Sequence, residues 1–210
     1  MRTEDVIEAL VRDAKSSRRC FACRFAVTEA AGIAVAVALF LSTLGLRADF
    51  AEAMLTPWYA LKISILLSTA ALAVPIVGAL ARPGAEVRSA GLFLPVALLA
   101  LAVAADLAIL GTPGSLMRLE GKNAISCLLF IPFFAAAPLV ATLIALRDGA
   151  PIRPACAGLA AGLLSGAVGG LLYGLYCPDD SPLFVAVWYP IGIALVAAAG
   201  ALAGRLLLRW

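Results

Sequence analysis

The stretch ACAGLAAGLLSGAVGGLLYGL, residues 155–175, decides which kind of fold this chain can adopt. It contains no charged side chain and reaches the ~20 apolar residues that a membrane-spanning helix needs. Glycine recurs at every fourth position, at Gly158, Gly162, Gly166, Gly170 and Gly174. On a helix these positions lie roughly on one face, where a neighbouring backbone can approach closely. We therefore predict a tightly packed membrane helix here.

The last apolar stretch of the chain repeats this spacing at Gly200 and Gly204. Two uses of the glycines follow from small-residue packing in membranes. The last two helices can pack against each other, or the same face can join two copies of the chain. A homo-oligomer therefore stays open beside packing within one chain.

Five further apolar stretches accompany this segment, and 63% of the 210 residues are hydrophobic, well above the ~45–50% of soluble domains. Together the six stretches cover residues 26–46, 58–80, 90–110, 123–146, 155–175 and 183–207. Because each is continuously apolar rather than alternating, a closed β-barrel is excluded. We predict an all-α, polytopic membrane protein. A polar head, residues 1–25, precedes a domain of six transmembrane helices, residues 26–210.

The positive charges predict how these helices are oriented. Twelve of the sixteen lysines and arginines lie in the head, in the loops around residues 81–89 and 147–154, and at the carboxyl end. Since cytoplasmic segments carry the excess of Lys and Arg, we expect both termini in the cytoplasm. A net charge of +3 is too weak to suggest that nucleic acid is a direct partner.

The head has the pattern of a short amphipathic helix. Thr3 is a suitable N-cap, and an apolar stripe follows that ends near Ser16 and Ser17. The stripe consists of Val6, Ile7, Leu10, Val11 and Ala14. A helix that lies on lipid is rich in Lys and Arg, whereas residues 1–17 carry three basic and four acidic side chains. This balance favours a groove on a cytoplasmic protein over the lipid surface.

Few charged residues fall at membrane depth. Asp106, Lys62 and Lys122 all lie near the outer ends of their helices, so we expect Asp106 to pair with one of the two lysines. Glu29 lies near the inner end of the first helix, where Arg24 is the expected partner. Such residues are functional candidates by default, although shallow ones can also reach the interface.

The chain contains five cysteines and no histidine, which excludes Ser-His and Cys-His catalysis. Cys127 and Cys177 are the two cysteines predicted on the outer, oxidising side, where they could approach within disulfide reach. Asp179 and Asp180 beside them would raise the pKa of a thiol and could attract a soft divalent metal. A static disulfide is the alternative. Cys20, Cys23 and Cys156 are expected to be incidental.

Four motifs resemble those of the NrsF-type anti-sigma factors. They are PWYALK at 57–62, GKNAISCLLFIP at 121–132, YCPDDSPLFVAVWY at 176–189 and GRLLLRW at 204–210. The resemblance covers essentially the whole chain. It implies an inner-membrane protein, not an enzyme, that holds an extracytoplasmic-function sigma factor through its cytoplasmic amino-terminal segment.

The resemblance also implies that Cys127 and Cys177 sense heavy metals or oxidants, with no obligate cofactor and at most a transient divalent heavy-metal ion. The stripe Val6, Ile7, Leu10 and Val11 would then contact the sigma factor. Two other classes of protein remain as alternatives. A small transporter or ion pathway could use Asp106 with Lys62 or Lys122, and a membrane thiol oxidoreductase could use the outer cysteines.

Overall fold

A computed structural model describes residues 3–82, 84–86 and 89–208, with side chains from Phe21 onward. All regular structure in these residues is helical. Six helical stretches are long and apolar enough to cross a membrane, which confirms the prediction of an all-α chain with six candidate spans. They are Phe21–Thr43, Pro57–Leu80, Ala90–Leu110, Ser115–Arg147, Pro154–Tyr176 and Pro182–Leu207.

Proline and glycine set many of the helix boundaries. Three helices begin with a proline, Pro57, Pro154 or Pro182, where the missing N–H would have had no partner. Gly111 and Gly121 end two others with a positive φ, which glycine adopts without strain. The helices are α1 (Thr3–Thr43), α2 (Phe50–Ala53), α3 (Pro57–Leu80), η1 (Ala90–Leu92), α4 (Phe93–Leu110), α5 (Ser115–Glu120), α6 (Ala124–Arg147), α7 (Pro154–Tyr176) and α8 (Pro182–Leu207).

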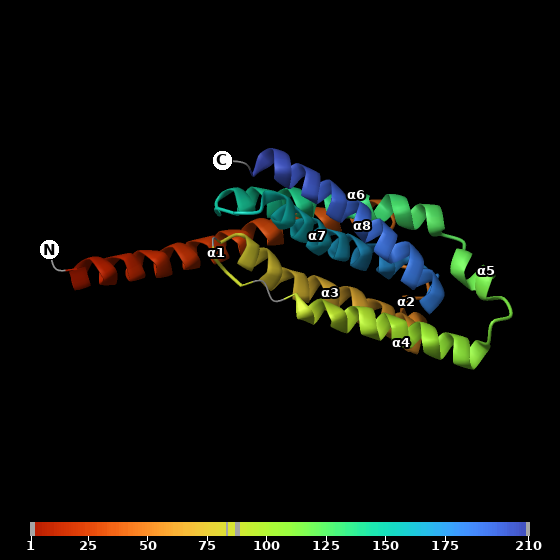
Figure 1. Cartoon of the computed structure of the whole chain (residues 1–210). Coiled ribbons are helices and arrows are strands. Elements are labelled where there is room, and N and C mark those ends of the chain that lie inside the picture. Colours follow the sequence, from red (N-terminus) through yellow and green to blue (C-terminus); the bar gives the residue numbers. More distant parts are fainter. Residues whose placement is uncertain (1–2, 83, 87–88, 209–210) are drawn as a thin grey trace.

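The helix of the head does not end near Ser16 and Ser17, as the sequence predicted. It continues into the first span as one helix of 41 residues, α1, which at ~1.5 Å per residue is about 60 Å long. The two serines cost little helix propensity, and neither proline nor glycine interrupts the chain before Gly32. The amino-terminal half of α1 therefore projects beyond the bundle (Figure 1).

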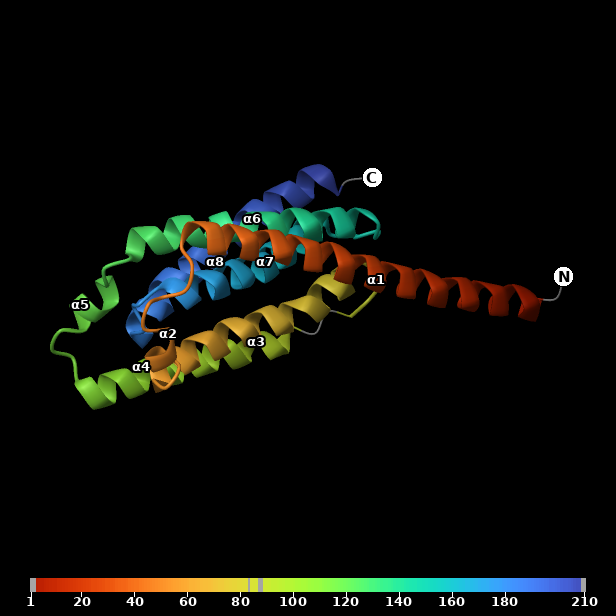
Figure 2. The same ribbon diagram turned by 180° about the vertical axis from the view of Figure 1, so that it is seen from behind.

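Both ends of the described chain lie at the same end of the bundle, and the short helices α2 and α5 lie at the opposite end (Figures 1 and 2). We call these the inner and the outer end. This arrangement agrees with an even number of spans. Which end faces the cytoplasm stays a prediction from the charge distribution.

The glycine-rich helix α7 lies at the centre of the bundle, and 72% of its 18-residue apolar stretch is buried. It packs most closely on α8, as predicted for the last two helices. A Cβ added to Gly158 would overlap the carbonyl oxygen of Gly200, and one added to Gly204 would overlap that of Pro154. Because α8 covers this part of the glycine face, it is not free to join a second copy of the chain.

Candidate functional site

The two outer cysteines come together in one buried cluster at the outer end. Cys127 lies in the first turn of α6, Cys177 directly follows α7, and both are fully buried and free. Aromatic side chains of α7 and α8 surround them, including Tyr173, Phe184 and Tyr189. Two free thiols that no water reaches are therefore held on two adjacent helices.

The segment that follows Cys177 is fixed by a buried lysine. The ammonium of Lys62 on α3 donates to the carbonyl oxygen of Cys177 at 3.0 Å and pairs with the carboxylate of Asp180. Only 1% of the Lys62 side chain is exposed, so this charge depends on its partners for stability. Through its ammonium group, Lys62 therefore links α3 to the segment that follows α7.

Arg47 completes this group from the segment between α1 and α2. Its guanidinium donates to Asp180 at 2.8 Å and to both carboxylate oxygens of Asp49 at 2.7 Å. The hydrogen bonds to Asp49 and Asp180 raise the pKa of Arg47, and the hydrogen bond from Arg47 lowers the pKa of Asp49. Arg47 and Lys62 also lie over the ring of Tyr59, at 5.5 and 5.2 Å from its centre. We call Arg47, Lys62 and Asp180 the polar cluster.

Asp179 binds the beginning of α6. Its Oδ2 accepts from the backbone N–H groups of Lys122 and Asn123 at 3.1 and 3.0 Å, and from the Asn123 amide at 2.9 Å. A helix N-terminus has unpaired N–H groups and a partial positive charge, which a carboxylate satisfies. The residue two positions after Cys177 therefore caps the helix that carries Cys127.

This arrangement corrects the predicted ion pairs. Asp106 pairs with Arg118 at 3.2 Å instead of with a lysine, because the side chain of Arg118 on α5 reaches back to the end of α4, where it also donates to the carbonyl oxygen of Gly111 at 2.8 Å. Lys62 pairs with Asp180, and Lys122 meets Asp179 through its backbone N–H. The predicted pairing of Asp106 with a lysine rested on the similar depth of these residues in the membrane. Depth alone does not determine which helices are neighbours.

The metal site predicted from Cys127, Cys177, Asp179 and Asp180 is not preformed. Within the described residues, no group of three Cys, Asp or Glu side chains is close enough to hold a metal ion. Both aspartates are bound elsewhere, Asp179 to the start of α6 and Asp180 to the polar cluster. Two sulfur atoms remain as the ligands that a soft metal would meet.

Burial is the main reason why the pKa of Cys177 is raised, and Lys62 opposes this effect. The sequence pointed to the neighbouring aspartates as the cause, whereas Asp179 makes only a small contribution. The structure also places a positive group, the ammonium of Lys62, beside Cys177.

At the inner end, α1 is attached to α6. The hydroxyl of Thr142 donates to Glu29 at 2.6 Å, and Arg24 pairs with Asp148 at 2.7 Å. The expected pairing of Glu29 with Arg24 is therefore wrong. A Cβ on Gly32 would lie 2.7 Å from that of Ala141, so the two helices touch closely just beyond the Glu29–Thr142 contact, toward the outer end.

The predicted partner-binding residues lie on the projecting part of α1. The helix includes Val6, Ile7, Leu10 and Val11, but their side chains lie outside the described residues, as does that of Cys20. Cys23 and Cys156 are exposed at the inner end, away from the outer pair. The structure brings Cys127 and Cys177 together and leaves Cys23 and Cys156 apart from them.

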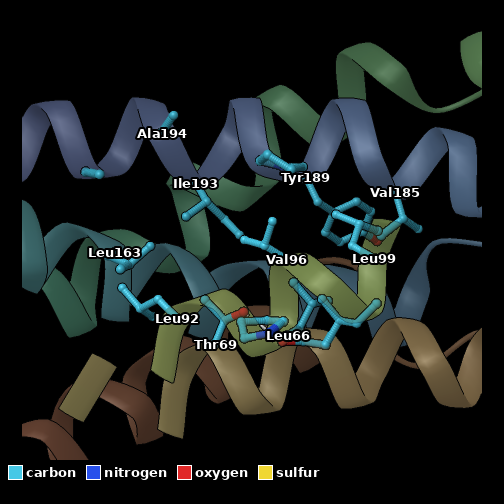
Figure 3. A pocket seen from close by; sticks show the side chains of 14 residues that line it. Leu66, Thr69, Leu92, Val96, Leu99, Leu163, Val185, Tyr189, Ile193 and Ala194 are labelled. Atoms are coloured by element: carbon cyan, nitrogen blue, oxygen red, sulfur yellow. Dashed lines mark hydrogen bonds between the residues drawn. The ribbon is translucent and has the colours of Figure 1, made fainter. Parts of the chain in front are cut away.

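An apolar cavity of about 360 Å³ lies between α3, α4 and α8 (Figure 3). Leu66, Val96 and Ile193 point into it, and Thr69 and Tyr189 are the polar residues of its wall. The hydroxyl of Tyr189 is buried, 3.6 Å from the position that a Cβ on Gly174 would occupy. The lining therefore offers surface for a hydrocarbon chain and no group suited to chemistry.

Comparison with known proteins covers the whole chain. A family model described as negative regulator of sigma F, NrsF, matches residues 10–210. The chain is 37% identical over 214 residues to a probable anti-sigma-F factor NrsF of Azospira oryzae, and 37% identical over 215 residues to an anti-sigma-F factor NrsF of Caulobacter vibrioides. Each match spans 100% of both chains. No solved structure matches this chain.

Proposed function

Because this chain belongs to the NrsF family of negative regulators of sigma F, we propose that it holds an extracytoplasmic-function sigma factor at the bacterial inner membrane until a stress signal arrives. The match over the full length of both relatives, which are named anti-sigma-F factors, supports the anti-sigma role in this proposal. The family is a class of regulators, which argues against the alternative of a thiol oxidoreductase. The alternative of an ion pathway loses its predicted pair, since Asp106 is bound to Arg118.

The projecting part of α1 is the proposed binding site for the sigma factor. It extends beyond the inner end of the bundle, where a soluble partner can surround it (Figure 2). An amphipathic helix of this kind binds by laying its apolar stripe in a groove of the partner. In this proposal Val6, Ile7, Leu10 and Val11 form that contact.

Two substitutions test the stripe. Val6→Asp combined with Leu10→Asp would place carboxylates in the apolar contact, and we expect the sigma factor to be lost from the purified complex. Ala9→Asp adds a carboxylate to the opposite face and should leave the complex intact. Retention of the sigma factor by the first variant would contradict the proposed contact.

Cys127 and Cys177 are the proposed receivers of the signal. Their burial in one cluster supports this role, because a bond between them, or a metal ion bound by both, would link the start of α6 to the end of α7. Oxidation would form one S–S bond, break two S–H bonds, release two protons and transfer two electrons to the oxidant. A soft divalent metal would instead displace the two thiol protons and bind both sulfurs.

Serine substitutions separate sensing from repression. Cys127→Ser combined with Cys177→Ser should keep a sigma-dependent reporter silent and abolish its induction by oxidants and by heavy-metal salts. The matched control is Cys23→Ser with Cys156→Ser, at two exposed positions, and it should respond like the parent protein. Normal induction in the first variant would exclude the outer pair as the sensor.

A further inference from the structure

A short, hydrogen-bonded connection links α1 to Arg47. The N–H groups of Leu44 and Gly45 both donate to the carbonyl oxygen of Phe40, at 3.0 and 2.9 Å, and Gly45 has a φ of 67°. This pattern closes the last turn of a helix and leaves little freedom in the residues that follow. A displacement of Arg47 is therefore passed to the outer end of α1.

Arg47 in turn holds the cysteine segment on both sides of Cys177. Its backbone N–H donates to the carbonyl oxygen of Leu175 at 3.4 Å, and its guanidinium donates to Asp180. Only 9% of the Arg47 side chain is exposed, so solvent screens this pair less than a surface salt bridge. Lys62 binds the same segment to α3, whereas Arg47 binds it to α1.

These contacts matter because α1 carries the projecting head on one continuous helix. Within the bundle, α1 itself packs mainly on α6. Phe40 meets Phe134 edge to face at 5.7 Å in the outer half of this contact, and Thr142 donates to Glu29 in the inner half. A helix keeps its length when its end moves, since every turn is hydrogen-bonded.

We propose that Arg47 is the positioning residue that couples Cys177 to α1, so that a reaction of the cysteine pair displaces α1 together with its head. This inference rests on the proposed sensor function and adds the route by which the signal leaves the cysteines. Arg47 itself does not react. Its fork-shaped guanidinium binds Asp49 and Asp180 at the same time, which the single ammonium of a lysine cannot reproduce.

The test uses the full chain in lipid nanodiscs, with Cys20, Cys23 and Cys156 replaced by serine so that only the outer pair reacts. Phenylarsine oxide is the probe. It forms two As–S bonds with Cys127 and Cys177, and the two thiol protons leave with its oxygen as water. Hydrogen exchange is then measured in two segments, residues 36–47 at the end of α1 and residues 177–182.

In the parent chain we expect the probe to change exchange in both segments. In Arg47→Gln it should change residues 177–182 only, with the response of α1 reduced at least about fivefold, the lower end of typical coupling effects. Arg47→Lys should fall between the two. The matched control is Arg118→Gln, which breaks another ion pair of the outer end and should respond like the parent.

An unchanged response of α1 in Arg47→Gln, or no response of α1 in the parent, would overturn the coupling role of Arg47. Retention of the sigma factor is measured in the same samples. If α1 responds and the sigma factor stays bound, the coupling stands and the proposed release fails. Should Arg47→Gln not fold, Arg47→Lys decides, because it keeps the positive charge and loses the forked contact.

Discussion

The packing of α7 on α8 makes a sharp prediction for the substitution Gly158→Ala. The added methyl group would meet the carbonyl group of Gly200 and the Cα of Gly204, which are backbone atoms that cannot rotate away. The two helices must therefore separate or tilt. Gly78 in α3 provides the matched control, because a Cβ there would meet nothing within 4 Å.

The two substitutions share one favourable effect and differ in one unfavourable effect. Alanine stabilises a helix interior by about 1 kcal/mol relative to glycine. Forcing extra atoms into a well-packed contact costs about 1–3 kcal/mol. We therefore expect Gly78→Ala to leave the free energy of unfolding unchanged or to raise it. Gly158→Ala should unfold more easily than Gly78→Ala by about 1–3 kcal/mol, the packing cost alone.

Unfolding in mixed detergent and dodecyl sulfate micelles, followed by circular dichroism, measures this difference. Both variants should keep the helical content of the parent in mild detergent. Equal unfolding free energies for Gly158→Ala and Gly78→Ala would refute the close backbone contact between α7 and α8.

Two further predictions concern the polar contacts, and a third concerns the reactivity of the cysteines. Asp179→Asn weakens the cap of α6 and should lower the free energy of unfolding by about 1 kcal/mol in the same micelle assay. Thr142→Val keeps the shape of the side chain but leaves Glu29 without its hydroxyl donor, so a loss of about 1–3 kcal/mol is expected. At pH 8 iodoacetamide should modify exposed Cys23 well before Cys177, because burial raises the pKa of Cys177 and little of its thiolate forms. Unfolding the protein should abolish this difference in rate. Equal rates of modification in the folded protein would contradict the prediction.

The sequence predicted the spans well because the length of an apolar stretch is a local property. Residues 58–80 and 183–207 differ from α3 and α8 by one residue at their starts. The end of the head helix was placed wrongly at Ser16 and Ser17, since serine only mildly disfavours a helix. The sequence contains no proline and no glycine before Gly32, so no stronger stop signal interrupts the helix and α1 is continuous.

The partners of the buried charges could not be predicted in the same way. Asp106 and Lys62 were recognised as important, but their partners lie in the connections between the long helices, Arg118 on the short helix α5 and Asp180 between α7 and α8. The positions of these connections depend on the whole bundle. Nothing in the sequence indicated a role for Arg47 beyond that of a basic residue on the outer side. The meeting of Cys127 and Cys177 was anticipated, because two residues near the same ends of adjacent helices need only correct packing.

The burial of α7 has a consequence for biosynthesis. This helix emerges from the ribosome before α8, and until α8 follows, the backbone of its glycine face lies against lipid without side chains to cover it. The bundle can therefore reach its native packing only after translation has passed Pro182–Leu207. A chain released earlier would leave the glycine face of α7 without the helix that packs against it.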